Sequence, residues 1–84
     1  MKKVVKFGGS SLASAEQFKK VGEIIRSDAA RRYVVPSAPG KRHSGDTKVT
    51  DLLYQLYDST EDEALFQETL KEIKGRYQEI IDGL

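Results

Sequence analysis

The chain has 84 residues, no cysteine, a single histidine and a formal net charge of +1. A chain of this length folds as one small domain at most, and it buries only roughly 60–65% of the surface that its unfolded form exposes. Without cysteine it can form neither a disulfide nor a thiolate metal site, and His43 alone cannot build a zinc site. These absences fit a reducing cytoplasm, which is where we expect the protein.

Charge and hydropathy exclude two further classes of protein. No apolar run approaches the roughly 18 residues that a membrane span needs, and residues 1–5 lack the hydrophobic region of a secretory signal.

Charge is unevenly distributed along the chain. Residues 1–50 carry eleven Lys or Arg against four Asp or Glu, whereas residues 51–84 carry three against nine. A basic first half suits an anionic ligand such as a nucleotide phosphate, and attraction between the two halves explains it equally well. The basic residues are not interleaved with aromatic ones, so nothing indicates nucleic-acid binding.

The chain begins with the pattern of a strand, a turn and a helix. Val-Val-Lys-Phe at residues 4–7 predicts a short buried strand that ends at Gly8-Gly9. Ser14 and Gln17 have capping-box spacing, and the apolar residues behind them repeat at helical period. We therefore expect a helix over residues 14–27.

A second strand is predicted at residues 33–36, Tyr-Val-Val-Pro, where the proline ends it because it has no N–H for the ladder. Strand, helix and strand within about 35 residues make a right-handed βαβ unit with parallel strands. Residues 37–48 then contain two glycines, a proline and no apolar periodicity. This composition predicts a mobile loop.

Two further helices are predicted after this loop. The first starts near Val49 and is broken at Asp58-Ser59. The second begins at a capping box formed by Thr60 and Glu63. Gly83 is expected to be its C-terminal glycine. The apolar face of the first helix consists of Val49, Leu52, Leu53 and Leu56, and that of the second of Phe66, Leu70, Ile73, Tyr77, Ile80 or Ile81, and Leu84.

The predicted number of strands is too small for a free-standing α/β fold. Two short parallel strands do not form a stable sheet alone, and parallel sheets are normally covered on both faces. Both edges of the pair would be open to another chain. We therefore expect residues 1–84 to be part of a larger α/β domain, and to self-associate through the exposed edges.

The segment around the first turn is the best candidate for a ligand site. Lys6 lies at the C-terminal end of the first strand, where ligands of open α/β sheets gather. Gly8 and Gly9 let the backbone approach a ligand and adopt positive φ. Ser10 and Ser11, with exposed N–H groups, lead toward a helix start that favours an anion. This pattern predicts a phosphate-binding turn. The alternative is an ordinary Gly-Gly turn beside a surface lysine.

Other candidate motifs carry less weight. Residues 40–45 have the glycine spacing of a Walker P-loop, but Asp46 stands where that motif needs lysine, so we reject it. His43 lies in the predicted loop and is interpreted as a solvated side chain. Asp46 and Asp51 could bind magnesium, but helix capping and solvation explain them as well. No metal-ligating residue is assigned.

Three segments of the chain resemble the aspartokinases, within the amino-acid kinase superfamily. Val-Val-Lys-Phe-Gly-Gly-Ser-Ser at residues 4–11 is similar to the opening signature of that family. Val-Val-Pro-Ser-Ala-Pro-Gly at 34–40 and Thr-Lys-Val-Thr-Asp-Leu-Leu at 47–53 are similar to its second and third blocks, at matching spacing. Related branches such as glutamate 5-kinase vary the opening motif, and glutamate 5-kinase is kept as the alternative. The resemblance implies that residues 1–84 are the N-terminal βαβ unit and two helices of a three-layer α/β/α amino-acid kinase domain, incomplete here.

The resemblance also implies a reaction and the residues that carry it. The parent enzyme would transfer the γ-phosphoryl group of ATP, with Mg²⁺, to L-aspartate and give 4-phospho-L-aspartate, the first step toward lysine, threonine and methionine. Lys6 would be catalytic, neutralising charge on the transferring group. The adenine site and further aspartate-binding groups would lie outside these residues, so we expect no kinase activity from the 84 residues alone. The residues implied to bind ATP are Lys6, Gly8, Gly9 and Ser10, and those implied to bind aspartate are Ser37 and Thr50.

Overall fold

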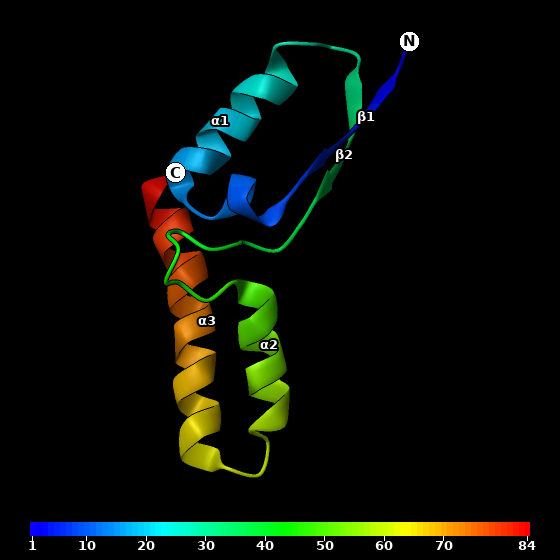
Figure 1. Ribbon diagram of the computed structural model, residues 1–84. Helices are drawn as coiled ribbons and strands as arrows, with labels where there is room; N and C mark the ends of the chain where they lie inside the picture. The colour runs from blue at the N-terminus through cyan, green and yellow to red at the C-terminus, as the bar shows by residue number, and fades with distance from the viewer.

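The computed structural model describes residues 1–84, and its elements follow the predicted order (Figure 1). Two parallel strands joined by a helix form the βαβ unit in the upper half of Figure 1, and the last two helices form an antiparallel hairpin below it. No helix has the combination of length and apolar character that crossing a bilayer requires. The elements are β1 (Lys3–Phe7), the 3-10 helix η1 (Gly9–Leu12), α1 (Ala15–Arg26), β2 (Arg31–Pro36), α2 (Val49–Asp58) and α3 (Glu63–Gly83).

The sheet is covered on one face only. Side chains alternate along β1, so Val5 and Phe7 are half-buried toward α1 while Val4 and Lys6 are exposed on the other face. In the parallel register Lys6 pairs with Val35, which is 48% exposed. The two-strand α/β unit is confirmed, whereas the expectation of a buried strand is wrong, since no residue of β1 or β2 is fully buried and Val34, on the face toward α1, is 39% exposed. Neither α2 nor α3 lies over the second face, so these residues form two of the three expected layers (Figure 1).

The core lies below the sheet, between α3 and the two helices that pack against it, α1 and α2. Val49 at the start of α2 is fully buried, and Leu52 one turn later is 3% exposed. The predicted apolar face of α2 is wrong at Leu53, which is 48% exposed, because α3 packs against only one side of α2. The buried apolar residues are Leu12, Ala13, Val21, Val49, Leu52, Ile73 and Ile80.

The two helix starts differ in how well the capping pattern predicted them. Ser14 caps α1 as predicted, since its Oγ accepts the N–H of Gln17 at 3.3 Å. The start of α3 was predicted at Thr60, but the cap is Asp62, whose carboxylate accepts the Leu65 N–H at 3.1 Å. A carboxylate is the stronger acceptor, and its negative charge is favourable at a helix N-terminus.

Gly83 has a different role from the predicted one. It is the last residue of α3 and has no positive φ, so it is not a left-handed C-terminal glycine. Its Cα instead lies against Ala15 at the start of α1, where an added Cβ would overlap the Ala15 Cβ. The missing side chain lets α3 approach α1 (Figure 1).

Replacing Gly83 by alanine is expected to lower the free energy of unfolding by about 1 kcal/mol, as overpacking between two helices does. The matched control is Gly75→Ala in the same helix, where an added Cβ meets no atom within 4 Å. That change should be neutral or stabilising by up to about 1 kcal/mol, because alanine favours helix. Urea denaturation followed by circular dichroism measures both. Equal stability of the two variants would contradict the contact with Ala15.

Candidate functional site

The carboxyl ends of the two strands bring two segments together that are about 30 residues apart in sequence. Because the strands are parallel, both end at the same edge of the sheet. The Ser37 N–H donates to the Phe7 carbonyl oxygen at 3.1 Å, and the Gly40 N–H donates to the Gly9 carbonyl oxygen at 2.7 Å. The turn after β1 and the loop after β2 therefore lie side by side.

Two glycines make the contact between these segments possible. A Cβ added to Gly40 would lie 2.6 Å from the Gly9 carbonyl carbon and 2.8 Å from the Ser10 nitrogen. A Cβ added to Gly9 would lie 3.2 Å from both the Gly40 Cα and the Ala38 carbonyl oxygen. No glycine in the chain has positive φ, so the predicted left-handed conformation of Gly8 and Gly9 is wrong. Gly9 is needed because backbone packs on backbone there.

Several backbone donors at this edge are available to a ligand. The Gly8 N–H has no hydrogen bond within the chain, and neither η1 nor α2 has a side-chain cap. In the first turn of α2, the Val49 N–H donates to Pro39, and those of Asp51 and Leu52 donate to Lys48. The remaining N–H of that turn belongs to Thr50, which is exposed. Unsatisfied N–H groups at a helix start favour an anion.

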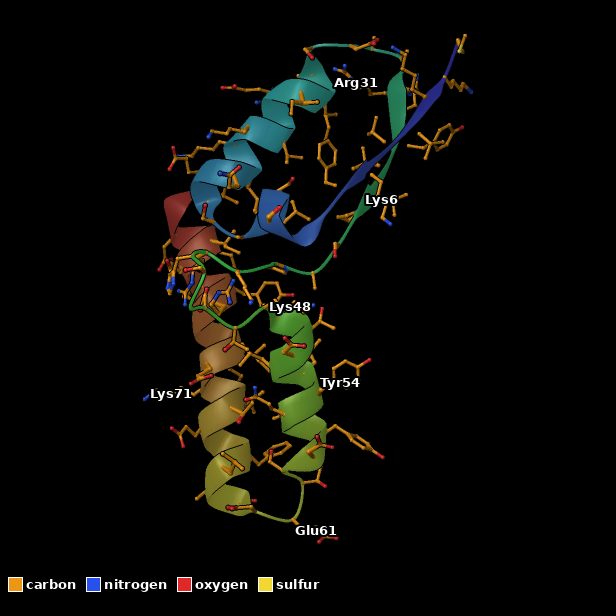
Figure 2. The ribbon with its side chains drawn as sticks, viewed as in Figure 1. Lys6, Arg31, Lys48, Tyr54, Glu61 and Lys71 are labelled. Carbon is orange, nitrogen blue, oxygen red and sulfur yellow. The ribbon has the colours of Figure 1, made fainter.

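The structure places the predicted site residues at exposed positions on the sheet, at its carboxyl edge and at the start of α2. Lys6 is exposed and projects from the sheet face opposite α1 (Figure 2). Ser10 and Ser37 are exposed at the carboxyl edge, and Thr50 is exposed in the first turn of α2. The structure thus joins the glycine turn to the Ser37–Gly40 loop, but no cavity encloses Lys6 together with Ser37 and Thr50.

The chain has two hollows, and both lie beside the helical hairpin. An apolar hollow of about 500 Å³ on α2 contains one predicted site residue, Thr50, with Leu53, Tyr54 and Tyr57. A polar cavity of about 400 Å³ lies between α3 and the loop that precedes α2. Its lining residues are Arg42, Asp46, Thr47, Leu52, Glu72, Gly75, Arg76 and Glu79.

Arg76 is not among the site residues predicted from the sequence, although its position on α3 offered a signal. Arg76 lies three residues after Ile73 and four before Ile80, so it belongs to the buried face of α3. A charged residue at an inward position needs hydrogen-bond partners, and here they are the Thr47 and Gly40 carbonyl oxygens, at 2.7 and 2.6 Å.

The loop predicted to be mobile is held by charged side chains. Arg42 donates to both carboxylate oxygens of Asp46, from Nε at 2.7 Å and from Nη2 at 3.0 Å, and its Nη1 donates to Glu79 on α3 at 2.8 Å. The Arg76 guanidinium lies 3.6 Å from the same Asp46 carboxylate. The bond to Glu79 and the contact with Arg76 come from α3, far along the chain, whereas the Arg42–Asp46 bonds lie within the loop itself.

The fork of hydrogen bonds from Arg42 holds the pKa of Asp46 well below its ordinary range, although partial burial opposes this shift. A carboxyl whose folded pKa is depressed stabilises the fold above its unfolded pKa of about 3.9, and this stabilisation is lost as the pH falls. We expect unfolding free energy to fall between about pH 5 and pH 2. In Asp46→Asn the unfolding free energy should fall less over this pH range. The fall that remains would come from Asp28, whose pKa is lowered by Lys3. If denaturant titrations gave the unsubstituted chain and Asp46→Asn the same dependence of unfolding free energy on pH, this role of Asp46 would be contradicted.

Comparison with known proteins finds aspartokinases among the relatives. No protein-family model matches the chain. Aspartokinase 3 of Bacillus subtilis (strain 168) is 69% identical over 51 residues, which is 61% of this chain and 11% of that relative. An aspartokinase of Chlamydia pneumoniae is 39% identical over 85 residues, which covers 100% of this chain and 17% of that relative.

A solved structure extends the similarity to three dimensions. The crystal structure of Clostridium acetobutylicum aspartate kinase, described as an allosteric enzyme, matches with a TM-score of 0.89 and 53% sequence identity. The match covers 96% of this chain and 19% of that chain. The 84 residues therefore span between about a tenth and a fifth of the length of the proteins that they resemble.

Proposed function

Because this chain belongs to the aspartokinase family, we propose that it forms the phosphate-binding part of an enzyme that phosphorylates L-aspartate. In that reaction a β-carboxylate oxygen of aspartate bonds to the γ-phosphorus of ATP and the bond to ADP breaks, which gives 4-phospho-L-aspartate. The observation that carries the proposal is the close Gly9–Gly40 contact at the carboxyl edge of the sheet, with Lys6 exposed near it. The place of this reaction in lysine, threonine and methionine synthesis, and a cytoplasmic location, belong to the same proposal.

Phosphoryl transfer depends mainly on positioning and on electrostatic stabilisation, which this edge is suited to supply. The Lys6 ammonium group would neutralise negative charge on the transferring phosphoryl group. The free Gly8 N–H, together with Gly9 and Ser10, would hold the ATP phosphates. No three His, Asp or Glu side chains converge in the structure, so we propose that Mg²⁺ is bound through the nucleotide phosphates and not by a ligand set of this chain.

The acceptor would bind on the α2 side of the same edge. The exposed Thr50 lies in the uncapped first turn of α2, where the helix dipole favours a carboxylate. Ser37 follows β2 directly and its N–H donates to the Phe7 carbonyl oxygen at the end of β1, so its hydroxyl would lie near the nucleotide. We propose that Thr50 and Ser37 orient aspartate toward the phosphoryl group.

A chimera tests the proposal on a complete catalytic unit. Residues of this chain replace the matching segment of Clostridium acetobutylicum aspartate kinase, to which they are 53% identical. We expect the chimera to form ADP in the presence of aspartate and ATP, and the 84 residues alone to show no turnover. A folded chimera without activity would contradict the proposed function. Glutamate offered as the acceptor tests the glutamate 5-kinase alternative, and we expect aspartate to be preferred.

A second proposal concerns the 84 residues by themselves, which we expect to self-associate. Val4, Tyr33 and Val35 are 70%, 53% and 48% exposed on the uncovered face of the sheet, and both strand edges are open. Apolar surface and unpaired strand edges of this kind favour association with a second copy. Sedimentation velocity at micromolar concentrations should show species larger than the monomer of 9.4 kDa. A single monomeric species would contradict this proposal.

A further inference from the structure

Arg76 is the one charged residue in the buried core, and the proposed reaction does not use it. Its side chain is 5% exposed and comes from α3, an element to which the sequence motifs assign no role. Placing a guanidinium group in a core is costly unless its donors are satisfied. The bonds that satisfy Arg76 therefore indicate what it does.

Those bonds join both halves of the proposed site. Nη2 of Arg76 donates to the Gly40 carbonyl oxygen at 2.6 Å, and the Gly40 N–H in turn donates to Gly9. Nη1 donates to the Thr47 carbonyl oxygen at 2.7 Å, three residues before Thr50. The guanidinium group of Arg76 thus bonds to the loop at two points: at Gly40, where the loop contacts the glycine turn, and at Thr47, just before α2.

Few other hydrogen bonds connect the loop at Gly40 directly with the start of α2. The Val49 N–H donates to Pro39, and the Arg42–Asp46 pair closes the intervening residues on themselves. Asp46 also faces Arg76 at 3.6 Å, so its charge helps to hold the guanidinium in place. A lysine could supply the charge, but it lacks the rigid fork that reaches two carbonyl groups at once.

We propose that Arg76 is a positioning residue that fixes the separation between the Gly9–Gly40 contact and the first turn of α2. This role rests on the proposed function. The phosphoryl donor would be held at the glycine turn and the carboxylate acceptor at α2, and α3 would align the two through Arg76. Arg76 acts through the backbone of residues 40–47 and touches neither substrate.

Amide hydrogen exchange on the 84-residue chain tests the positioning directly. In Arg76→Lys and Arg76→Met, exchange of the Gly40 and Val49 amides should accelerate at least tenfold more than exchange of amides within α1. Lys74→Met, an exposed change on the same helix, is the control and should leave these ratios unchanged. Acceleration by the same factor in α1, or none at Gly40 and Val49, would overturn the proposal.

Kinetics of the chimera supply a second readout that a purely structural role would not produce. Arg76→Lys should reduce kcat at least tenfold while the KM for ATP changes less than threefold, because the substrates still bind but are misaligned. A variant with unchanged kcat, or with only a raised KM, would overturn the alignment role. If the unsubstituted chimera is inactive, the proposed function fails, whereas the exchange result still decides whether Arg76 holds the loop.

Discussion

Gly40→Ala is expected to lower the free energy of unfolding by about 2–3 kcal/mol, the upper part of the range for overpacking. The added Cβ would lie 2.6 Å from the Gly9 carbonyl carbon and 2.8 Å from its oxygen, and no rotamer change can move backbone atoms. The loop would have to shift, which breaks the Gly40–Gly9 hydrogen bond and the bond from Arg76 to the Gly40 carbonyl. The substitution also covers the Ser10 nitrogen, so the chimera should lose activity even where it stays folded.

Two neighbouring glycines provide a graded control for this prediction. Gly8 has φ of −75° and an added Cβ meets no atom within 4 Å, so Gly8→Ala should change stability by less than about 0.5 kcal/mol. Gly9→Ala should lie between the two, since its closest contacts are at 3.2 Å. Urea denaturation of the three variants at one temperature gives the order. If Gly40→Ala were as stable as Gly8→Ala, the described contact between the loop and the turn would be wrong.

Lys6→Met is expected to reduce kcat of the chimera by about 100-fold to 1,000-fold, the usual loss when a group that stabilises transition-state charge is removed. The ammonium group of Lys6 extends from an exposed face of the sheet, and methionine has a similar length without the charge. The change removes no buried contact, so the free energy of unfolding should stay within about 0.5 kcal/mol. Steady-state kinetics with ATP and aspartate, beside denaturant titrations, separate the two effects.

The control for Lys6 is another lysine of the same strand region. Lys2→Met removes the same charge from an exposed position before β1 and should leave kcat unchanged. Lys6→Arg keeps the charge but changes its shape and hydration, so partial activity is expected. Equal activity of Lys6→Met and Lys2→Met would remove the electrostatic basis of the proposed function.

Local patterns in the sequence predicted the order and type of the elements. The run Val-Val-Lys-Phe and the two glycines after it located β1, and Pro36 located the end of β2. Helical periodicity and Ser14 located α1 to within one residue at each end. These features act between residues at most four positions apart, and such short-range preferences can be read from sequence. The segments resembling aspartokinases likewise indicated the family from the sequence alone.

The tertiary structure alone decided how these elements meet. The Gly9–Gly40 contact, the bonds of Arg76 to the loop and the approach of Gly83 to Ala15 join residues 29 or more positions apart. No periodic pattern specifies such partners, because each contact depends on the directions in which the strands and helices leave one another. The role of Gly83 was mistaken for this reason. The sequence therefore determined the local elements and the family, and three-dimensional packing determined which side chains hold the proposed site in place.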